Sequence, residues 1–231
     1  MSPRSKTLSA LAATLLAGNA SAEIETQVHA GYSNAYLWRG LHLGNDLIET
    51  GVDSSTEWND ISLSAGAWYA NFQTAGEHLD ELDLYAEASK DFEWVKGSIG
   101  YIAYLYPNSN GSTYQEISFG VSRDLGFATA SLKYFWGVQG ENYDYTEFAL
   151  SKSFKLHPRL NLGVDSNIGY RLEEGQATAW TTKLTLAWDI FEHTKLSPFV
   201  ALSIPLGDDP DTDYSNSHSE FVAGSMLSYT F

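Results

Sequence analysis

The sequence contains no cysteine, so it can form neither a disulfide framework nor a metal site built on thiolates. Basic residues are scarce as well, with 13 Lys and Arg against 29 Asp and Glu and a formal net charge of −16. Such a chain has no basic patch with which to bind nucleic acid or an anionic membrane surface. After residue 22, no apolar run is long enough to cross a bilayer as a helix.

Residues 1–22 have the pattern of a secretory signal peptide. Arg4 and Lys6 form a short basic start, an apolar stretch follows, and Ala20-Ser21-Ala22 has the small-x-small form of a cleavage site. The apolar stretch is shorter than the roughly 20 residues that a spanning helix needs, which disfavours the alternative of a retained anchor. We therefore expect an exported chain of residues 23–231, which keeps 11 basic and 29 acidic residues, a net charge of −18.

The end of the chain alternates with a period of two. From Phe221 to Phe231 every second residue is apolar or small, which is typical of a strand with one apolar face. Such a strand needs a neighbour on each edge, and in a closed sheet one neighbour is the first strand of the chain. We expect the barrel-assembly machinery to bind this last strand, which ends on Phe231.

The same alternation, interrupted by turn signals, continues through the rest of the exported chain. The expected strands are 24–39, 47–57, 61–72, 79–90, 94–106, 114–123, 127–138, 143–153, 160–170, 177–190, 196–206 and 219–231. An even number of strands is usual in bacterial outer-membrane barrels. The sequence therefore predicts an all-β fold in one domain, 23–231: a closed antiparallel transmembrane β-barrel of about twelve strands.

The connections between the expected strands alternate between two lengths. The short ones are 59–60, 91–93, 124–126, 155–159 and 192–194, and the mostly longer, polar ones are 41–46, 73–78, 107–113, 139–142, 172–176 and 207–218. Short periplasmic turns and longer extracellular loops are typical of outer-membrane barrels.

Aromatic residues gather near the strand ends, at two levels, as they do where a barrel crosses the two interfaces of a bilayer. The periplasmic level would hold Trp58, Trp94, Phe127, Phe154, Trp188 and Phe231, and the outer level Tyr36, Trp38, Tyr69, Trp136 and Tyr170. We therefore expect the chain in the outer membrane of a Gram-negative bacterium, with lipid as a partner.

Several segments of the N-terminal half resemble the TorF family of outer-membrane porins. They are Ser33–Gly40, Ser64–Asn71, Glu81–Tyr85, Gly100–Pro107 and Tyr114–Ser118, in this order. The C-terminal half agrees with the family only in its barrel pattern. The resemblance implies an outer-membrane β-barrel and leaves the transported solute unassigned.

The polar faces of the expected strands would point into the barrel and bring carboxylates together there. They hold Glu25, Glu49, Asp53, Glu57, Asp83, Glu87, Glu116, Glu147, Asp165 and Asp189, against Arg39, Lys96, Lys133, Arg171 and Lys183. An acidic lumen lowers the barrier for cations and repels anions. We expect the pore lining to include Arg39, Glu49, Asp53, Asp83, Glu87, Glu116, Glu147, Asp165 and Lys183.

Arg39 has two interpretations. It could be the charge at a constriction that sorts solutes, or a structural arginine forked onto neighbouring carboxylates such as Glu49 or Asp53.

The acidic loop 207–218 is a weak candidate for a Ca²⁺ site. Asp209, Asp211 and Asp213 match the first, third and fifth places of a calcium loop. Tyr214 stands where that loop needs glycine, and strands flank it, so a solvated acidic loop is the alternative. We expect no other cofactor.

The sequence thus predicts a porin-like channel for passive passage of small hydrophilic solutes or cations, and no enzyme. A plugged barrel serving as a surface scaffold or adhesin is the alternative, and a soluble ligand-binding β-sandwich is a further one. An outer-membrane lipid hydrolase would need Ser, His and an orienting polar group together near the rim. His42, His78 and His218 lie on the outer side, but no serine stands in a nucleophile motif beside them.

Overall fold

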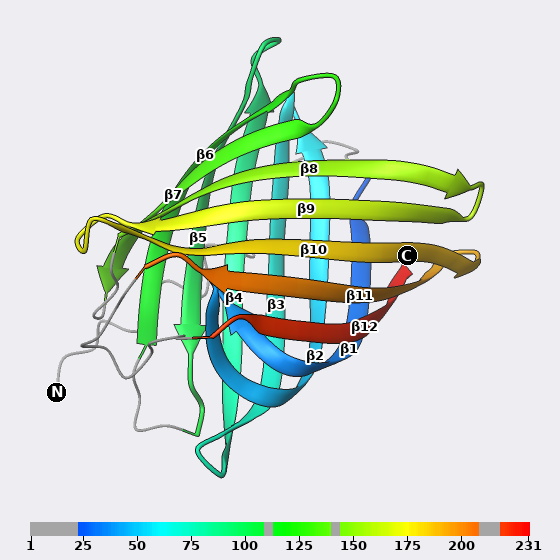
Figure 1. Cartoon of the computed structure of the whole chain (residues 1–231). Coiled ribbons are helices and arrows are strands. Elements are labelled where there is room, and N and C mark those ends of the chain that lie inside the picture. Colours follow the sequence, from blue (N-terminus) through cyan, green and yellow to red (C-terminus); the bar gives the residue numbers. More distant parts are fainter. Residues whose placement is uncertain (1–22, 109–112, 140–143, 208–217) are drawn as a thin grey trace, which may run out of the picture.

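The computed structural model describes residues 23–108, 113–139, 144–207 and 218–231, and within them it has twelve strands and no helix that could cross a membrane. Each strand pairs antiparallel with the next in sequence, and β1 pairs with β12, so the sheet is a closed barrel (Figure 1). The strands are β1 (Glu25–Trp38), β2 (Leu41–Trp58), β3 (Ile61–Thr74), β4 (Glu77–Asp91), β5 (Lys96–Leu105), β6 (Thr113–Asp124), β7 (Thr129–Gln139), β8 (Tyr145–His157), β9 (Leu160–Arg171), β10 (Gln176–Phe191), β11 (Thr194–Pro205) and β12 (Glu220–Thr230). The predicted fold class and strand number are confirmed, and a two-sheet sandwich is excluded.

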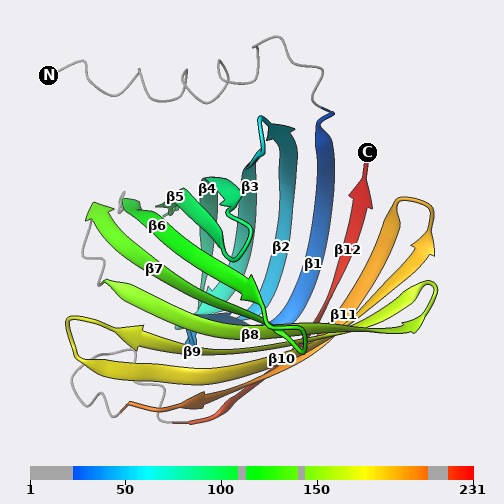
Figure 2. The same ribbon diagram turned by 90° about the horizontal axis from the view of Figure 1, so that it is seen from above.

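The last strand closes the barrel on the first one. Gln27 is opposite Thr230 and Ser33 is opposite Gly224, and the Phe231 backbone N–H donates to the carbonyl oxygen of Thr26 at 2.8 Å. Closure leaves no unpaired strand edge along this seam. The start of β1 and the end of β12 therefore lie at the same end of the barrel, here named the terminal end (Figure 2). The opposite end is named the loop end.

The two faces of the barrel wall have opposite polarity. Buried polar side chains point inward, namely Ser33, Glu81, Asp83, Ser89, Glu116, Ser118, Ser203 and Ser228. Large apolar side chains alternate with inward positions and are exposed on the outside, as in β12, where Phe221 is 59% and Leu227 48% exposed. A continuous exposed apolar surface of this kind requires apolar surroundings. The period-two prediction for the lipid face of β12 is thus confirmed.

Two of the loop-end connections are shorter than predicted. The predicted loop 41–46 is part of β2, and the predicted loop 73–78 is only the turn Ala75-Gly76 between β3 and β4. Arg39-Gly40 and Ala75-Gly76 have positive φ at both residues (51° and 83°, 49° and 85°), as two-residue type I′ hairpins require. The prediction is wrong here because polar residues at the end of a hairpin look like loop residues in the sequence.

Two prolines, Pro198 and Pro205, lie within β11. Pro198 faces outward and stands where the pairing of β11 with β10 is interrupted, between Phe199 and Leu196. Pro205 is the last residue of the strand. A proline can occupy such positions because its missing N–H removes no ladder hydrogen bond.

Candidate functional site

The β1–β2 hairpin fills the interior of the barrel at the loop end. The hairpin is strongly curved in Figure 1, and the Tyr36 ring contacts Trp68 and Phe72 of β3 at centroid distances of 5.7 and 5.0 Å. The Trp38 ring lies edge-on to Tyr104 of β5 at 6.0 Å. Tyr36 and Phe72 are buried, with 7% and 2% of their surface exposed. The prediction that Tyr36 and Trp38 belong to the outer aromatic level is therefore wrong, whereas Tyr69, Trp136 and Tyr170 are exposed as expected.

The tip of this hairpin lies against β10, a strand that is not its neighbour in the sheet. A Cβ atom added to Gly40 would collide with Ala179 of β10, and the Ser203 hydroxyl of β11 would be 3.6 Å away. Gly40 also has a φ of 83°, which residues other than glycine adopt only with strain. Glycine is therefore required here by the backbone and by the contact together.

Arg39 extends from this tip to the far wall and forms the central ion pair of the loop end. Its Nη1 and Nη2 atoms donate to Oε1 and Oε2 of Glu116 on β6 at 2.8 and 2.6 Å. The guanidinium lies 4.3–4.5 Å from the ring centroids of Trp38, Phe135 and Tyr145. The Arg39 side chain is 11% exposed and that of Glu116 is fully buried. A two-pronged ion pair enclosed by aromatic rings holds its geometry tightly.

This arrangement settles which partner Arg39 takes. Of the two interpretations of Arg39, the arginine forked onto a carboxylate agrees with this geometry. The neighbours named for it, Glu49 and Asp53, are not its partners, because the curvature of the hairpin carries Arg39 away from its own sheet neighbours. Glu49 instead accepts a hydrogen bond from Trp68 Nε1 at 2.7 Å. Asp53 accepts one from the Tyr85 hydroxyl at 2.5 Å and lies 3.3 Å from His29 Nδ1.

Two buried carboxylates on β4 lie beside the Arg39–Glu116 ion pair. Glu81 and Asp83 are 1% and 8% exposed, and they share the inward face with Tyr85 and Glu87. The Tyr106 hydroxyl donates to Glu81 Oε1 at 3.3 Å, but Glu81 Oε2 and Asp83 Oδ1 receive no hydrogen bond. The predicted pore lining includes Asp83 but not Glu81. The same period-two rule would have found Glu81, since it stands two residues before Asp83 on the same face.

The remaining expected lining residues of β4 to β8 lie nearer the barrel middle. Lys133 Nζ of β7 donates to Glu87 Oε2 at 2.7 Å, and both side chains are about one-third exposed (36% and 35%). Glu147 of β8 pairs in register with Lys133 and accepts a long hydrogen bond, 3.5 Å, from the Tyr145 hydroxyl. The Lys133–Glu87 pair is therefore more exposed to water than the Arg39–Glu116 pair.

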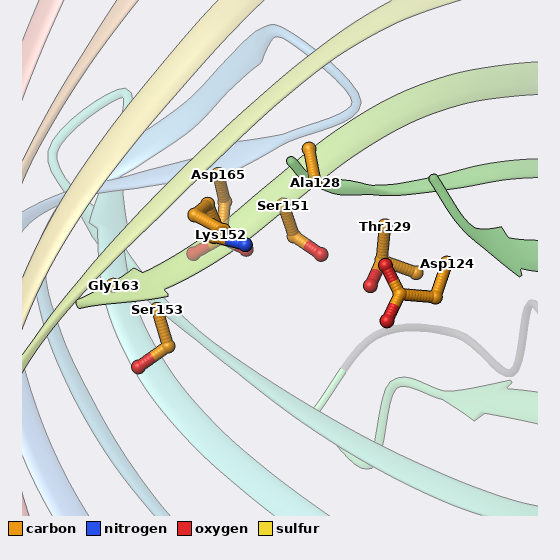
Figure 3. Close-up of a pocket in the computed structure, with 8 residues that line it drawn as sticks. All are labelled: Asp124, Ala128, Thr129, Ser151, Lys152, Ser153, Gly163 and Asp165. Atoms are coloured by element: carbon orange, nitrogen blue, oxygen red, sulfur yellow. The ribbon is translucent and has the colours of Figure 1, made fainter. Parts of the chain in front are cut away.

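The lumen widens at the terminal end into a polar pocket of about 390 Å³. It is lined by Asp124, Ala128, Thr129, Ser151, Lys152, Ser153, Gly163 and Asp165. Figure 3 shows Asp124 next to Thr129, with Ser151 between Thr129 and Asp165 in this view. Small hydroxyl side chains, the carboxylates of Asp124 and Asp165 and the ammonium of Lys152 make the lining of this pocket hydrophilic. Lys183, which is opposite Asp165 in the β9–β10 register, has its ammonium 4.1 Å from the Phe199 ring centroid.

Two expectations fall on residues outside the described part of the chain. They are the signal peptide 1–22, and Asp209, Asp211 and Asp213 of the Ca²⁺ candidate loop. Within the described residues, no group of three or more His, Cys, Asp or Glu side chains could hold a metal ion.

Two of the histidines considered for catalysis have polar partners. His42 Nδ1 lies 3.1 Å from Glu220 Oε2, and His78 Nδ1 lies 3.1 Å from Asn71 Oδ1. His78 is on the outward side of the β3–β4 hairpin, and His42 is near the start of β2, next to the Arg39-Gly40 turn. The two imidazoles therefore do not share one site.

Comparison with known proteins supports the fold. A family model described as a bacterial protein of unknown function matches residues 17–194. No curated protein sequence matches the chain. The solved KdgM porin has a TM-score of 0.55 and 8% identity, over 90% of this chain and 99% of that chain. An outer-membrane channel from Pseudomonas putida F1 has a TM-score of 0.55 and 10% identity, over 93% and 97% of the two chains.

The barrel is also similar to a protein of another kind. The outer-membrane phospholipase of Salmonella typhi, solved as a dimer with bound calcium, has a TM-score of 0.51 and 10% identity, over 88% of this chain and 90% of that chain. At such identities the likeness shows the outer-membrane barrel fold, and function has to be argued from the lumen. None of the matches described above carries the TorF name, so that resemblance stays a prediction.

Proposed function

The chain belongs to the Gcw_chp family of bacterial proteins of unknown function, and we propose that it is an outer-membrane channel that passes small cations and other small hydrophilic solutes by diffusion. The proposal is carried by one observation, the inverted polarity of the barrel. Its inner face is polar and rich in carboxylates, while its outer face is apolar and exposed. In this orientation the terminal end is periplasmic and the loop end extracellular.

The proposed constriction is the Arg39–Glu116 layer. Arg39 and Glu116 join the hairpin tip to β6, and their side chains have almost no exposed surface. A solute that crosses the barrel therefore has to pass beside this ion pair. The carboxylates of Glu81, Asp83 and Glu147 lie near this layer, and together they give it a negative potential. A polyanion such as the oligogalacturonate bound in a KdgM structure would be repelled by such a lumen, so we propose a different cargo.

The test is single-channel recording of the refolded barrel, residues 23–231, in a planar bilayer with a salt gradient. We expect small conductance steps and a cation-selective reversal potential. Arg39→Ala should raise the conductance, because it removes the side chain that joins the two walls. Lys195→Ala is the matched control, since Lys195 lies near the terminal end, 3.9 Å from Asp189 and half exposed. Anion selectivity would contradict the proposal.

A plugged barrel that serves as a surface scaffold is the second candidate. The observation that favours it is the hairpin that crosses the interior at the loop end. A barrel that inserts and is heat-modifiable on a gel, but passes no current either as wild type or as Arg39→Ala, would establish this candidate in place of the channel.

A further inference from the structure

The Glu81–Asp83 pair places two carboxylates side by side in the buried part of the lumen. The two residues are two positions apart on β4 and therefore point to the same side of the sheet. Glu81 is 1% exposed and Asp83 is 8% exposed. Tyr104 is opposite Asp83 in the β4–β5 register, and the Tyr106 hydroxyl binds Glu81 Oε1. The pair is thus enclosed by oxygen atoms and aromatic rings.

No positive charge of the described chain neutralises this pair. The guanidinium of Arg39 is engaged by both oxygens of Glu116. The ammonium of Lys133 is bound to Glu87. Glu81 and Asp83 form no ion pair with a described residue, and one oxygen of each, Glu81 Oε2 and Asp83 Oδ1, is buried without a hydrogen bond. A buried carboxylate without a countercharge is strongly unfavourable, and two adjacent ones repel each other.

We propose that Glu81 and Asp83 form a binding site for one hard divalent cation, Mg²⁺ or Ca²⁺, beside the Arg39–Glu116 layer. Carboxylate and hydroxyl oxygens are the ligands that these ions prefer, and Mg²⁺ is commonly held by one or two carboxylates. A divalent ion matches the two negative charges, so Coulomb attraction favours it over K⁺ or Na⁺. Since the described chain offers only these two carboxylates at this point, water completes the coordination shell.

The effect of this site on current depends on the proposed channel function, whereas binding of the cation does not. A cation held beside the constriction would obstruct the path of K⁺, so Mg²⁺ should reduce a K⁺ current. In a barrel without an open pore, the same ion would bind and stabilise the fold, because a ligand that binds only the folded state raises the free energy of unfolding.

The first experiment measures binding by titration calorimetry of the refolded barrel in detergent with MgCl₂ and CaCl₂, at constant ionic strength set by KCl. The test variant is Glu81→Gln/Asp83→Asn. The matched control is Asp46→Asn/Glu77→Gln, which removes the same charge from two exposed residues at the loop end. We expect one divalent ion per barrel in the wild type and the control, and affinity weaker by about tenfold or more in the test variant.

The alternative is a proton shared between the two carboxyl groups, which would also relieve their repulsion. In that case the wild type binds no divalent ion, or binds it as tightly as the test variant does, and either result overturns the proposal. The test variant should fold, because amides of the same shape replace uncompensated charges. If the test variant shows no heat-modifiable band on a gel, it has not folded. The single variant Asp83→Asn then replaces it in the titration.

The second experiment separates this site from the channel proposal. MgCl₂ is added to the bilayer chamber during K⁺ conduction. Block in the wild type and in Asp46→Asn/Glu77→Gln, but not in Glu81→Gln/Asp83→Asn, supports the site. A silent barrel that still binds one Mg²⁺ refutes the channel and keeps the site, whereas a conducting barrel without Mg²⁺ binding refutes the site and keeps the channel.

Discussion

Arg39 and Glu116 are 77 residues apart in the sequence, yet their side chains meet in a two-pronged ion pair with N–O distances of 2.8 and 2.6 Å. The pair joins the tip of the first hairpin to the sixth strand, on the other side of the lumen. The wall of the barrel is held by backbone hydrogen bonds between neighbouring strands, whereas this pair connects elements that are not neighbours in the sheet. It therefore fixes the position of the hairpin inside the barrel.

Removal of one partner of this pair should strongly lower the free energy of unfolding. Glu116→Gln leaves the Arg39 guanidinium buried without a full countercharge, and Arg39→Ala leaves the Glu116 carboxylate in the same situation. For a buried pair we expect a loss of about 3–5 kcal/mol in the free energy of unfolding. The measurement is urea-induced unfolding in lipid vesicles followed by tryptophan fluorescence.

The double variant Arg39→Ala/Glu116→Ala completes the thermodynamic cycle. It should be less destabilised than the sum of the two single alanine variants, because no charge is left unpaired. Strict additivity would show that the two side chains do not interact in the folded barrel.

The Lys133–Glu87 pair provides a contrast at a similar N–O distance. Its side chains are about one-third exposed, so water screens the attraction and compensates a missing partner. Glu87→Gln should change the free energy of unfolding by less than about 1 kcal/mol. If Glu87→Gln costs as much as Glu116→Gln in the same vesicles, burial is not what distinguishes the two layers.

Gly40 and Gly76 form a natural pair of turn glycines. Their φ values are 83° and 85°, but an added Cβ would collide with Ala179 at Gly40 and would meet nothing within 4 Å at Gly76. Gly76→Ala should therefore lower the free energy of unfolding only by the backbone strain, on the order of 1 kcal/mol. Gly40→Ala should cost more and should also displace Arg39.

Ala179→Gly makes this prediction sharper, because it removes the atom with which the new Cβ collides. In the combination Gly40→Ala/Ala179→Gly, the part of the loss in unfolding free energy that comes from the collision should be recovered. The part that comes from backbone strain should remain. Equal unfolding midpoints for Gly40→Ala and Gly76→Ala would mean that the hairpin tip does not touch β10.

The sidedness of β10 can be tested with two adjacent residues. Leu184 faces outward with 42% exposure, and Thr185 is on the inner face opposite Gly163 of β9. Leu184→Arg places a charge in the hydrocarbon and should cost about 2–4 kcal/mol near the bilayer middle. Thr185→Arg, one residue further, should fold with a smaller loss. A reversed order in vesicle-refolding titrations would mean that the register of β10 is shifted by one residue.

The alternation of the sequence determined the wall of this barrel. A period of two assigns each residue to one of two faces, and a strand with one apolar face has to find two neighbours. Strand number, closure of β12 on β1 and the apolar exterior could therefore be predicted from residues such as Phe221, Leu227 and Phe231. The turns at Arg39-Gly40 and Ala75-Gly76 are shorter than the predicted loops, because polar residues at strand ends look like loop residues.

Only the tertiary structure decided what happens inside the wall. Alternation places Arg39, Glu81 and Glu116 on the inner side but does not say which of them meet across the lumen. That depends on the closure of the sheet and on the curvature of the first hairpin, which turns Tyr36 and Trp38 inward. The partners of inward side chains come from strands far apart in sequence, and no local pattern in the chain encodes the distance between opposite walls.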